Sequence, residues 1–333
     1  MFELSFIWAG IIAFAVLTYV ILDGFDLGVG ILSPLAEDET EKATMMNSIA
    51  PIWDGNETWL VLGGGGLFAV FPLAYAVIMP ALYMPIILML LALIFRGVAF
   101  EYRWRTERWK PVWDVAFFGG SIVAAFMQGI ALGALVQGIE VADRAYAGGW
   151  WDWLSVFSVL TGLAVVVGYA LLGATWIILK TEGRLQRHMQ GLAWWLGAVT
   201  LGFIGIVSIL TPFQDPEYFS RWFNLPGSIL SVLMPGAVLA AAWALFTGLN
   251  AGKDAQPFLA AISIFVLCFI GIGISFYPNI VPPSLTIVEA AAPDKSLRFA
   301  LVGTVVLVPM ILAYTAYAYW VFRGKIDPNE GYH

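Results

Sequence analysis

The sequence predicts an all-α, polytopic membrane protein of eight transmembrane helices, with one further segment, near residues 47–71, that is re-entrant or packed in the interior. Three observations predict this fold class. Of the 333 residues, 60% are hydrophobic and 12% are charged, and the mean hydropathy is +0.84, far from the balance of soluble domains. Eight apolar stretches reach the roughly 20 residues that cross a bilayer. The basic residues of the loops gather on alternate connections.

The eight spans follow one another with short connections, and no internal repeat or soluble domain interrupts them. We therefore expect residues 1–333 to form a single membrane domain. The first span has no basic segment before it and no small-residue cleavage site after it, so we interpret it as a retained helix and not as a signal peptide. In chain order the predicted spans are Phe6–Leu32, Pro80–Tyr102, Val112–Gly138, Leu154–Leu179, Gly191–Leu210, Ile229–Leu249, Pro257–Tyr277 and Arg298–Phe322.

Loop charges predict the orientation of these spans. If the segment near 47–71 does not cross, ten basic residues share one side with the C-terminus, and the opposite loops hold only Lys42, Arg144, Arg221 and Lys295. Cytoplasmic loops are enriched in Lys and Arg. This pattern places both termini in the cytoplasm and the acidic segment Glu37–Glu41 on the outer side. The ten residues are Arg103, Arg105, Arg108, Lys110, Lys180, Arg184, Arg187, Lys253, Arg323 and Lys325.

The segment Asn47–Phe71 is the most unusual part of the chain. It carries Asp54 and Glu57 between two tryptophans and continues into four consecutive glycines, Gly63–Gly66. Polar side chains stranded in hydrocarbon cost several kcal/mol, roughly, so these acids either lie in a loop or serve a function. The glycines permit close backbone approach inside protein. This segment is our first candidate for a functional site.

The end of the first span supplies a second pair of acids. Asp23 and Asp26 are three residues apart and share a helix face, and Gly24 and Gly28 form a G-x-x-x-G pattern that favours close helix packing. With the predicted orientation, Asp23 lies in the outer third of the membrane, on the side from which the segment near Asp54 enters. We expect the two acidic groups to meet. The alternative is that Asp23 and Asp26 only mark the end of the span.

Four further charged residues have less specific surroundings. Arg96 either pairs with a carboxylate inside the bundle or extends to the lipid headgroups. Glu101 lies one turn beyond it, near the cytoplasmic end of the same span. Asp114 is expected to be an exposed ion-pair partner of the nearby basic cluster. Glu289 lies in a proline-rich outer loop and is a weak signal alone.

Several classes of site are excluded by composition. The net charge of −7, and the lack of a Lys/Arg cluster that alternates with exposed aromatic residues, argue against nucleic-acid binding. A single cysteine, Cys268, cannot form a disulfide or a thiolate metal site within the chain. The two histidines, His188 and His333, lie outside the spans, so the chain alone cannot supply bis-histidine haem ligation. We expect neither a metal nor a cofactor to be held by this chain alone.

Three motifs resemble a known family. The segments LDGFDLGVG from Leu22, IAPIWDGNETW from Ile49 and PPSLTIVEAAAP from Pro282, together with Phe95-Arg96, are similar to subunit II of the cytochrome bd family of quinol oxidases. The segment that begins at Pro282 is most similar to the cyanide-insensitive branch. The resemblance covers nearly the full length, with spans and loop order in agreement, and the first two motifs are long and specific.

The resemblance implies a subunit of an oxidoreductase in the bacterial inner membrane that oxidises quinol and reduces dioxygen to water. Its partner is the haem-bearing subunit I, which holds two b-type haems and one further haem of d or b type. This chain would then be haem-free, would support assembly, and would have no catalytic residue of its own. Binding of small accessory subunits, or of quinone to this chain, stays open; membrane lipid surrounds the complex.

The resemblance also implies a role for the acids. Residues at the positions of Asp23, Asp26 and Asp54 are associated with a polar path near the subunit interface that delivers protons to the oxygen site. Glu57 is included as a candidate, although the matching position can be Gln in relatives. Arg96, Glu101 and Glu289 are interpreted as structural or ion-pair residues. Two alternatives remain: an ion-coupled secondary transporter, which also uses intramembrane acids and a broken segment, and a purely structural subunit.

Overall fold

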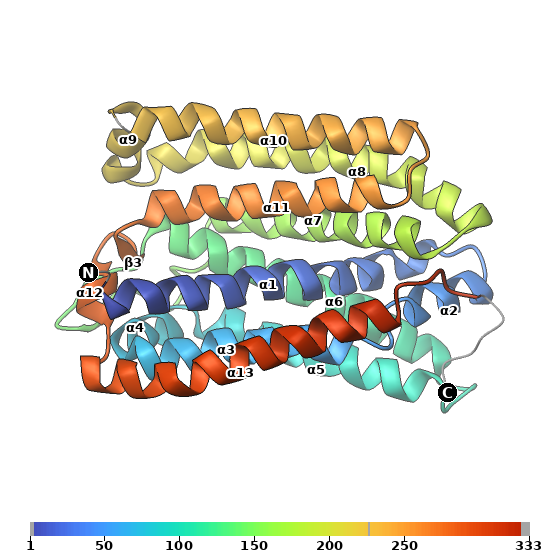
Figure 1. Cartoon of the computed structure of the whole chain (residues 1–333), viewed down its shortest axis with the longest axis horizontal. Helices are drawn as coiled ribbons and strands as arrows, with labels where there is room; N and C mark the ends of the chain where they lie inside the picture. The colour runs from blue at the N-terminus through green and yellow to red at the C-terminus, as the bar shows by residue number, and fades with distance from the viewer. Residues whose placement is uncertain (1–2, 226, 328–333) are drawn as a thin grey trace.

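The computed structural model describes residues 3–225 and 227–327 as a bundle of long helices that lie side by side (Figure 1). Shorter elements join them at both ends, and two small antiparallel hairpins lie at the end where α1 begins. The long helices are α1 (Leu4–Leu32), α3 (Trp53–Val70), α5 (Tyr83–Arg103), α6 (Lys110–Gln137), α7 (Val156–Lys180), α8 (Gly183–Leu210), α10 (Gly227–Asn250), α11 (Ala255–Phe276) and α13 (Asp294–Val321).

The short elements connect or extend these helices. Pro72 follows α3 directly and begins α4, where its missing N–H is tolerated because it occupies the first turn. The short elements are η1 (Ser33–Leu35), α2 (Glu39–Asn47), α4 (Pro72–Ala81), β1 (Val141–Ala142), β2 (Ala145–Tyr146), η2 (Thr211–Phe213), α9 (Pro216–Phe223), β3 (Asn279–Val281), β4 (Leu285–Thr286) and α12 (Ile287–Ala290).

Among the described residues, eight helices are long and apolar enough to cross a membrane, which confirms the predicted number. The segment predicted as re-entrant or interior is a helix, α3, that runs back along α1. Asn56 lies beside Asp26 near the end of α1, and Gly66 lies beside Ile12 near its beginning. The re-entrant alternative is therefore wrong, because α3 and α4 together run the length of the bundle.

This ninth lengthwise segment changes the topology. Arg184, which begins α8, forms ion pairs with Asp38 and Glu41, which follow α1. Lys180, at the end of α7, donates to the carbonyl of Gly324 beyond α13. We call this end of the bundle the basic end and the opposite one, which carries the β-hairpins, the hairpin end. The described chain begins at the hairpin end and finishes at the basic end (Figure 1).

Two features of this arrangement differ from the sequence-based expectations. Within residues 3–225 and 227–327 the chain begins and finishes at opposite ends of the bundle, and the acidic segment 37–41 lies at the basic end together with the basic loops. The positive-inside rule counts Lys and Arg, and acidic residues contribute little to it. At the basic end these acids are neutralised by direct ion pairs, so the charges never opposed this placement.

The close approach of α1 to α7 sets the position of the acids in α1. A Cβ atom on Gly24 would lie 2.8 Å from the ring of Tyr169, and one on Gly28 would lie 2.7 Å from the backbone nitrogen of Gly173. Neither separation is compatible with a larger side chain. As the G-x-x-x-G pattern predicts, the backbones meet directly, which leaves Asp23 and Asp26 fully buried.

Helix α13 is attached differently from the others. Leu297 is its one fully buried residue, and residues such as Val302 and Tyr314 are mostly exposed along it. At the hairpin end, Trp8 Nε1 donates to the carbonyl of Leu297 at 3.1 Å. At the basic end, residues 322–326 are bonded to the turn between α7 and α8. The helix is therefore fixed at both ends while its outer surface lies open.

Cysteine labelling would test the nine-segment topology. In a Cys268→Ser background, Thr40→Cys should react with a membrane-impermeant maleimide from the same side as Arg187→Cys, because both positions are exposed at the basic end. Ala147→Cys, which is exposed in the loop beside β2, should react only from the other side. Labelling of Thr40→Cys together with Ala147→Cys would show that α3 does not cross.

Candidate functional site

A buried group of charged and polar side chains lies where α1, α3, α5 and α13 meet, near the basic end. The late residues of α1 and the early residues of α3 reach the same level because α3 runs back along α1. Six residues separate Asp26 from Leu32 at the end of α1, which places Asp26 about 9 Å inside the helix end at 1.5 Å per residue. The group is therefore inside the bundle.

An ion pair between Arg96 and Asp23 is the centre of this group. Arg96 Nη1 lies 2.8 Å from Asp23 Oδ1, and the two side chains are 2% and 0% exposed. Glu57 Oε2 lies 3.4 Å from Arg96 Nη2 and remains 29% exposed. The guanidinium also lies 5.9 Å from the centre of the Trp53 ring. Of the two alternatives for Arg96, the structure places it against a carboxylate inside the bundle.

Asp26 belongs to a second series of hydrogen bonds. Asn56 Nδ2 donates to Asp26 Oδ2 at 2.8 Å, and the Tyr319 hydroxyl donates to Asn56 Oδ1 at 2.9 Å. These contacts join α1, α3 and α13. The second carboxylate oxygen of Asp26 is buried and has no hydrogen-bond donor among the described residues. A fully buried acid with a free acceptor atom is a candidate for proton binding.

A third series of hydrogen bonds extends from the site into the centre of the bundle. The Tyr169 hydroxyl donates to Gln128 Oε1 at 2.7 Å, and Gln128 Nε2 donates to the Tyr19 oxygen at 2.8 Å. Tyr19 lies one helical turn before Asp23, on the same face of α1. The polar groups therefore run from Glu57 through Arg96 and Asp23 to the interface of α6 and α7.

Asp54 does not join these buried acids. Its side chain is exposed on the outer surface of α3, in line with Thr58 and with Val61, which is 72% exposed. The expected meeting therefore occurs through Asn56 and Glu57, which point toward α1 and α5. Asp54 lies three residues before Glu57, so the two acids are neighbours on the helix surface.

The remaining candidate acids lie outside the buried group. Glu101 is exposed near the end of α5. Glu289 and Thr286 form the capping box of α12 at the hairpin end, and their hydrogen bonds hold the pKa of Glu289 below its usual range. Asp114 binds Arg103, with Oδ1 2.5 Å from Nε, and Lys42, with Oδ2 2.9 Å from Nζ. The expected ion pairing is present, but the Asp114 side chain is only 20% exposed rather than exposed as expected.

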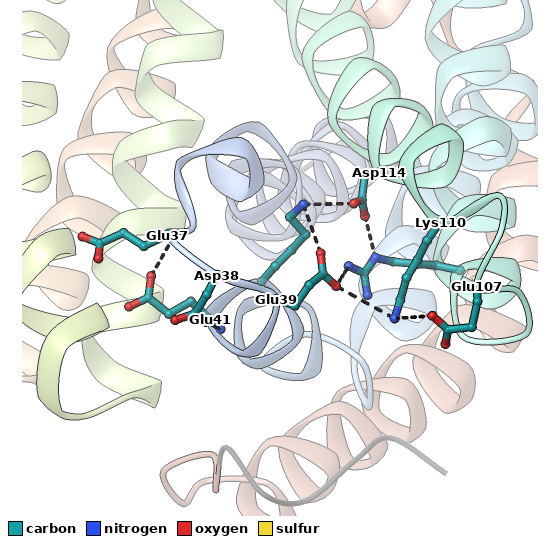
Figure 2. Close-up of polar contacts among 9 residues, drawn as sticks. Glu37, Asp38, Glu39, Glu41, Glu107, Lys110 and Asp114 are labelled. Carbon is teal, nitrogen blue, oxygen red and sulfur yellow. Dashed lines mark hydrogen bonds and ion pairs between the residues drawn. The ribbon is translucent and has the colours of Figure 1, made fainter.

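An ion-pair network covers the basic end next to the buried group (Figure 2). Arg103, which is 1% exposed, contacts Glu39 Oε2 at 2.8 Å in addition to Asp114. It lies two helical turns after Arg96 on the buried face of α5, so one helix anchors both the inner and the outer carboxylates. Asp38 accepts the backbone N–H of Glu41 and faces Arg184, and both contacts lower its pKa.

Sequence reasoning missed the uncharged members of the site. Asn56 was visible beside Glu57 but was not distinguished from a loop residue. The sequence could have indicated Tyr19 as a member of the site, because it precedes Asp23 by one turn in an apolar helix. No local pattern marks Gln128 or Tyr319, because their relation to the acids exists only once α6 and α13 are packed against α1 and α3.

Comparison with known proteins identifies the family. The family model of cytochrome bd terminal oxidase subunit II matches residues 4–322. The chain belongs to this family. Subunit 2 of the cytochrome bd-I ubiquinol oxidase of Escherichia coli K12 is 32% identical, with 98% of this chain and 96% of that protein covered. Subunit 2 of the cytochrome bd ubiquinol oxidase of Bacillus subtilis is 30% identical, with 99% of each covered.

A solved structure supports the fold. The bd oxidase from Geobacillus thermodenitrificans contains a chain that matches with a TM-score of 0.79, covering 96% of this chain and 98% of that one. The TM-score shows that the two chains share a fold, at a sequence identity of 17%. The likeness supports the helical architecture of this bd oxidase subunit II.

Within residues 3–225 and 227–327, no group of three or more His, Cys, Asp or Glu side chains could hold a metal ion. His188 lies near the start of α8, toward the basic end, and His333 lies outside the described residues. The buried group itself contains carboxylates, which can bind and release protons, and an amide and tyrosine hydroxyls, which hydrogen-bond with one another and with Asp26.

Substitution of Arg96 would test the buried ion pair. Arg96→Gln leaves Asp23 buried without its cation, so we expect a loss of about 3–5 kcal/mol of stability, seen as a lower unfolding midpoint or poor recovery of the complex. The double variant Asp23→Asn, Arg96→Gln should recover part of the loss. Arg105→Gln, at an exposed loop position, is the control. Equal stability of Arg96→Gln and Arg105→Gln would contradict the assignment.

Proposed function

We propose that this subunit II is the haem-free partner of a haem-bearing subunit I in a quinol oxidase of the bacterial inner membrane. The complex oxidises quinol and reduces dioxygen to water. The observation that carries the proposal is the match over nearly the whole chain to the second subunits of two ubiquinol oxidases. The transporter alternative finds no support in these comparisons. The haems, of b type with d or a further b type, are assigned to subunit I.

We infer that the basic end faces the cytoplasm. With α3 crossing, Lys42 joins the ten other basic residues at that end, and the hairpin end retains four, Arg144, Arg221, Lys295 and Arg298. The asymmetry follows the positive-inside rule. It places the C-terminus in the cytoplasm and the N-terminus on the opposite side, with residues 1–333 forming one membrane domain.

The outer surface of α3 is the proposed contact with subunit I. Asp54 is exposed at the level of the buried acids, on the same side of α3 as the exposed apolar residues Val61 and Phe68 farther along the helix. A carboxylate facing lipid at this depth is costly. A protein partner that supplies polar groups or water removes this cost. The exposed length of α13 beside α3 extends the same surface (Figure 1).

The acids form the proposed proton path of this subunit. Reduction of oxygen consumes protons, which cannot pass through hydrocarbon unaided. Asp26 and Asp23 lie inside the bundle near the cytoplasmic end, Glu57 is half-buried beside Arg96, and Asp54 is exposed on the surface proposed to meet subunit I. Glu57 lies between the buried acids and Asp54, so protons can move outward toward the partner. Glu101 and Glu289 take no part in this path.

A reduced-minus-oxidised absorption spectrum tests the proposed function. The complex is purified from its native membrane through a tag on this chain. We expect haem bands and quinol-driven oxygen uptake, because subunit I should co-purify. A colourless chain without a partner would overturn the oxidase assignment and favour a transporter.

Asp54→Asn tests the proton path against a purely structural role. Asparagine keeps the size and hydrogen bonding of the side chain but cannot carry a proton. We expect turnover to fall about a hundredfold or more, within the range for loss of one proton-transfer group, while the haem content stays normal. Glu101→Gln, at an exposed position outside the site, is the control. Full turnover of Asp54→Asn would exclude this acid from the path.

A further inference from the structure

The last residues of the described chain hold α13 against the site. Lys180 Nζ donates to the carbonyls of Phe322 and Gly324, and Ile326 N donates to the carbonyl of Lys180. Lys325 Nζ lies 2.7 Å from Asp254 Oδ2, before α11. We call residues 322–326, with Lys180 and Asp254, the C-terminal clasp. It joins α13 to two loops of the basic end.

Tyr319 lies one turn before the clasp and faces the bundle. Its ring lies 6.5 Å from that of Phe25 and 6.2 Å from that of Trp176, with near-perpendicular planes. Its hydroxyl donates to Asn56 Oδ1 at 2.9 Å. Helix α13 is otherwise mostly exposed, and Tyr319 connects it to the buried acids through Asn56.

The amide of Asn56 has two possible orientations, and its neighbours distinguish them. In the observed orientation Nδ2 faces two acceptors, Asp26 Oδ2 at 2.8 Å and the carbonyl of Leu22 at 3.4 Å, while Oδ1 accepts from Tyr319. A rotated amide would point its oxygen at the Asp26 carboxylate, placing two acceptors together. The Tyr319 hydroxyl therefore favours the orientation in which the amide donates to Asp26.

We propose that Tyr319 is a positioning residue for Asp26, and that it acts by orienting the Asn56 amide and is held in place by the C-terminal clasp. The charged or titratable groups around Asp26 are Asp23 from α1, Glu57 from α3, Arg96 from α5 and Tyr319 itself. Among these four groups, Tyr319 is the one whose hydroxyl donates to the amide oxygen of Asn56. This inference rests on the proposed function, because it concerns the same acid path.

Infrared difference spectroscopy of the whole complex tests the proposal directly. The carboxyl band of Asp26 is identified by its loss in Asp26→Asn. In Tyr319→Phe the amide loses its fixed orientation and donates less well to the carboxylate. We expect the protonated Asp26 band to persist to a pH about one unit higher than in the natural protein, the size expected for one hydrogen bond to a charged group.

Matched variants separate positioning from general damage. Tyr317→Phe removes a hydroxyl from an exposed position on the same helix and should leave the band unchanged. Lys325→Ala loosens the clasp and should shift the band in the same direction by a smaller amount. In an Asn56→Ala background, Tyr319→Phe should have no further effect, because the residue acts through Asn56. Haem content reports whether each complex is assembled.

The outcomes distinguish this inference from the proposed function. A shifted Asp26 band together with a shifted pH profile of oxygen uptake supports both. A shifted band with an unchanged oxygen-uptake profile supports the positioning role and counts against Asp26 in the proton path. An unshifted band in assembled Tyr319→Phe, or an equal shift in Tyr317→Phe, overturns the positioning role whatever the activity.

Discussion

An arginine and an aspartate held together between apolar helices impose the strongest constraint on this structure. Neither Arg96 nor Asp23 has a polar environment apart from the other and their few neighbours, so a bundle that separates them would leave a charge in a medium that cannot solvate it. This requirement fixes how α5 lies against α1. The small residues of α1, which let α7 approach closely, complete the enclosure. The helices therefore pack closely around a buried pair of charged side chains.

The sequence was sufficient for the fold class because membrane helices are recognised by length and apolarity, and the eight predicted spans are confirmed. It left α3 open between an interior and a re-entrant segment, because its first turns carry Asp54 and Glu57 and its middle is glycine. Hydropathy treats these residues as poor membrane residues, although one side of the helix is covered by α1. The predicted side of the N-terminus depends on this one helix, since each added crossing reverses the side of every later loop.

At the site, the sequence identified the acids but not their connections. Asp23, Asp26 and Glu57 were selected because charged residues within apolar segments are unusual, and they do lie together. Asp54 was grouped with them by proximity along the chain, yet helical geometry turns it toward the exposed surface of α3, away from Asp23 and Asp26. Asn56, Gln128 and Tyr319 connect helices that are far apart in sequence. Such residues are recognised only in three dimensions, because an uncharged polar side chain in a membrane helix has many possible partners.

The C-terminal clasp also has a consequence for the order in which the subunit is completed during synthesis. Residues 322–326 leave the ribosome after all the helices they bind, so Tyr319 reaches Asn56 only when the last helix has been inserted. Until then the polar centre is missing one of its hydrogen bonds, and the outer face of α3 lacks its neighbour. A chain interrupted before α13 would retain both residues of the inner ion pair but would lack the hydrogen bond from Tyr319 to Asn56, which makes the polar centre depend on insertion of α13.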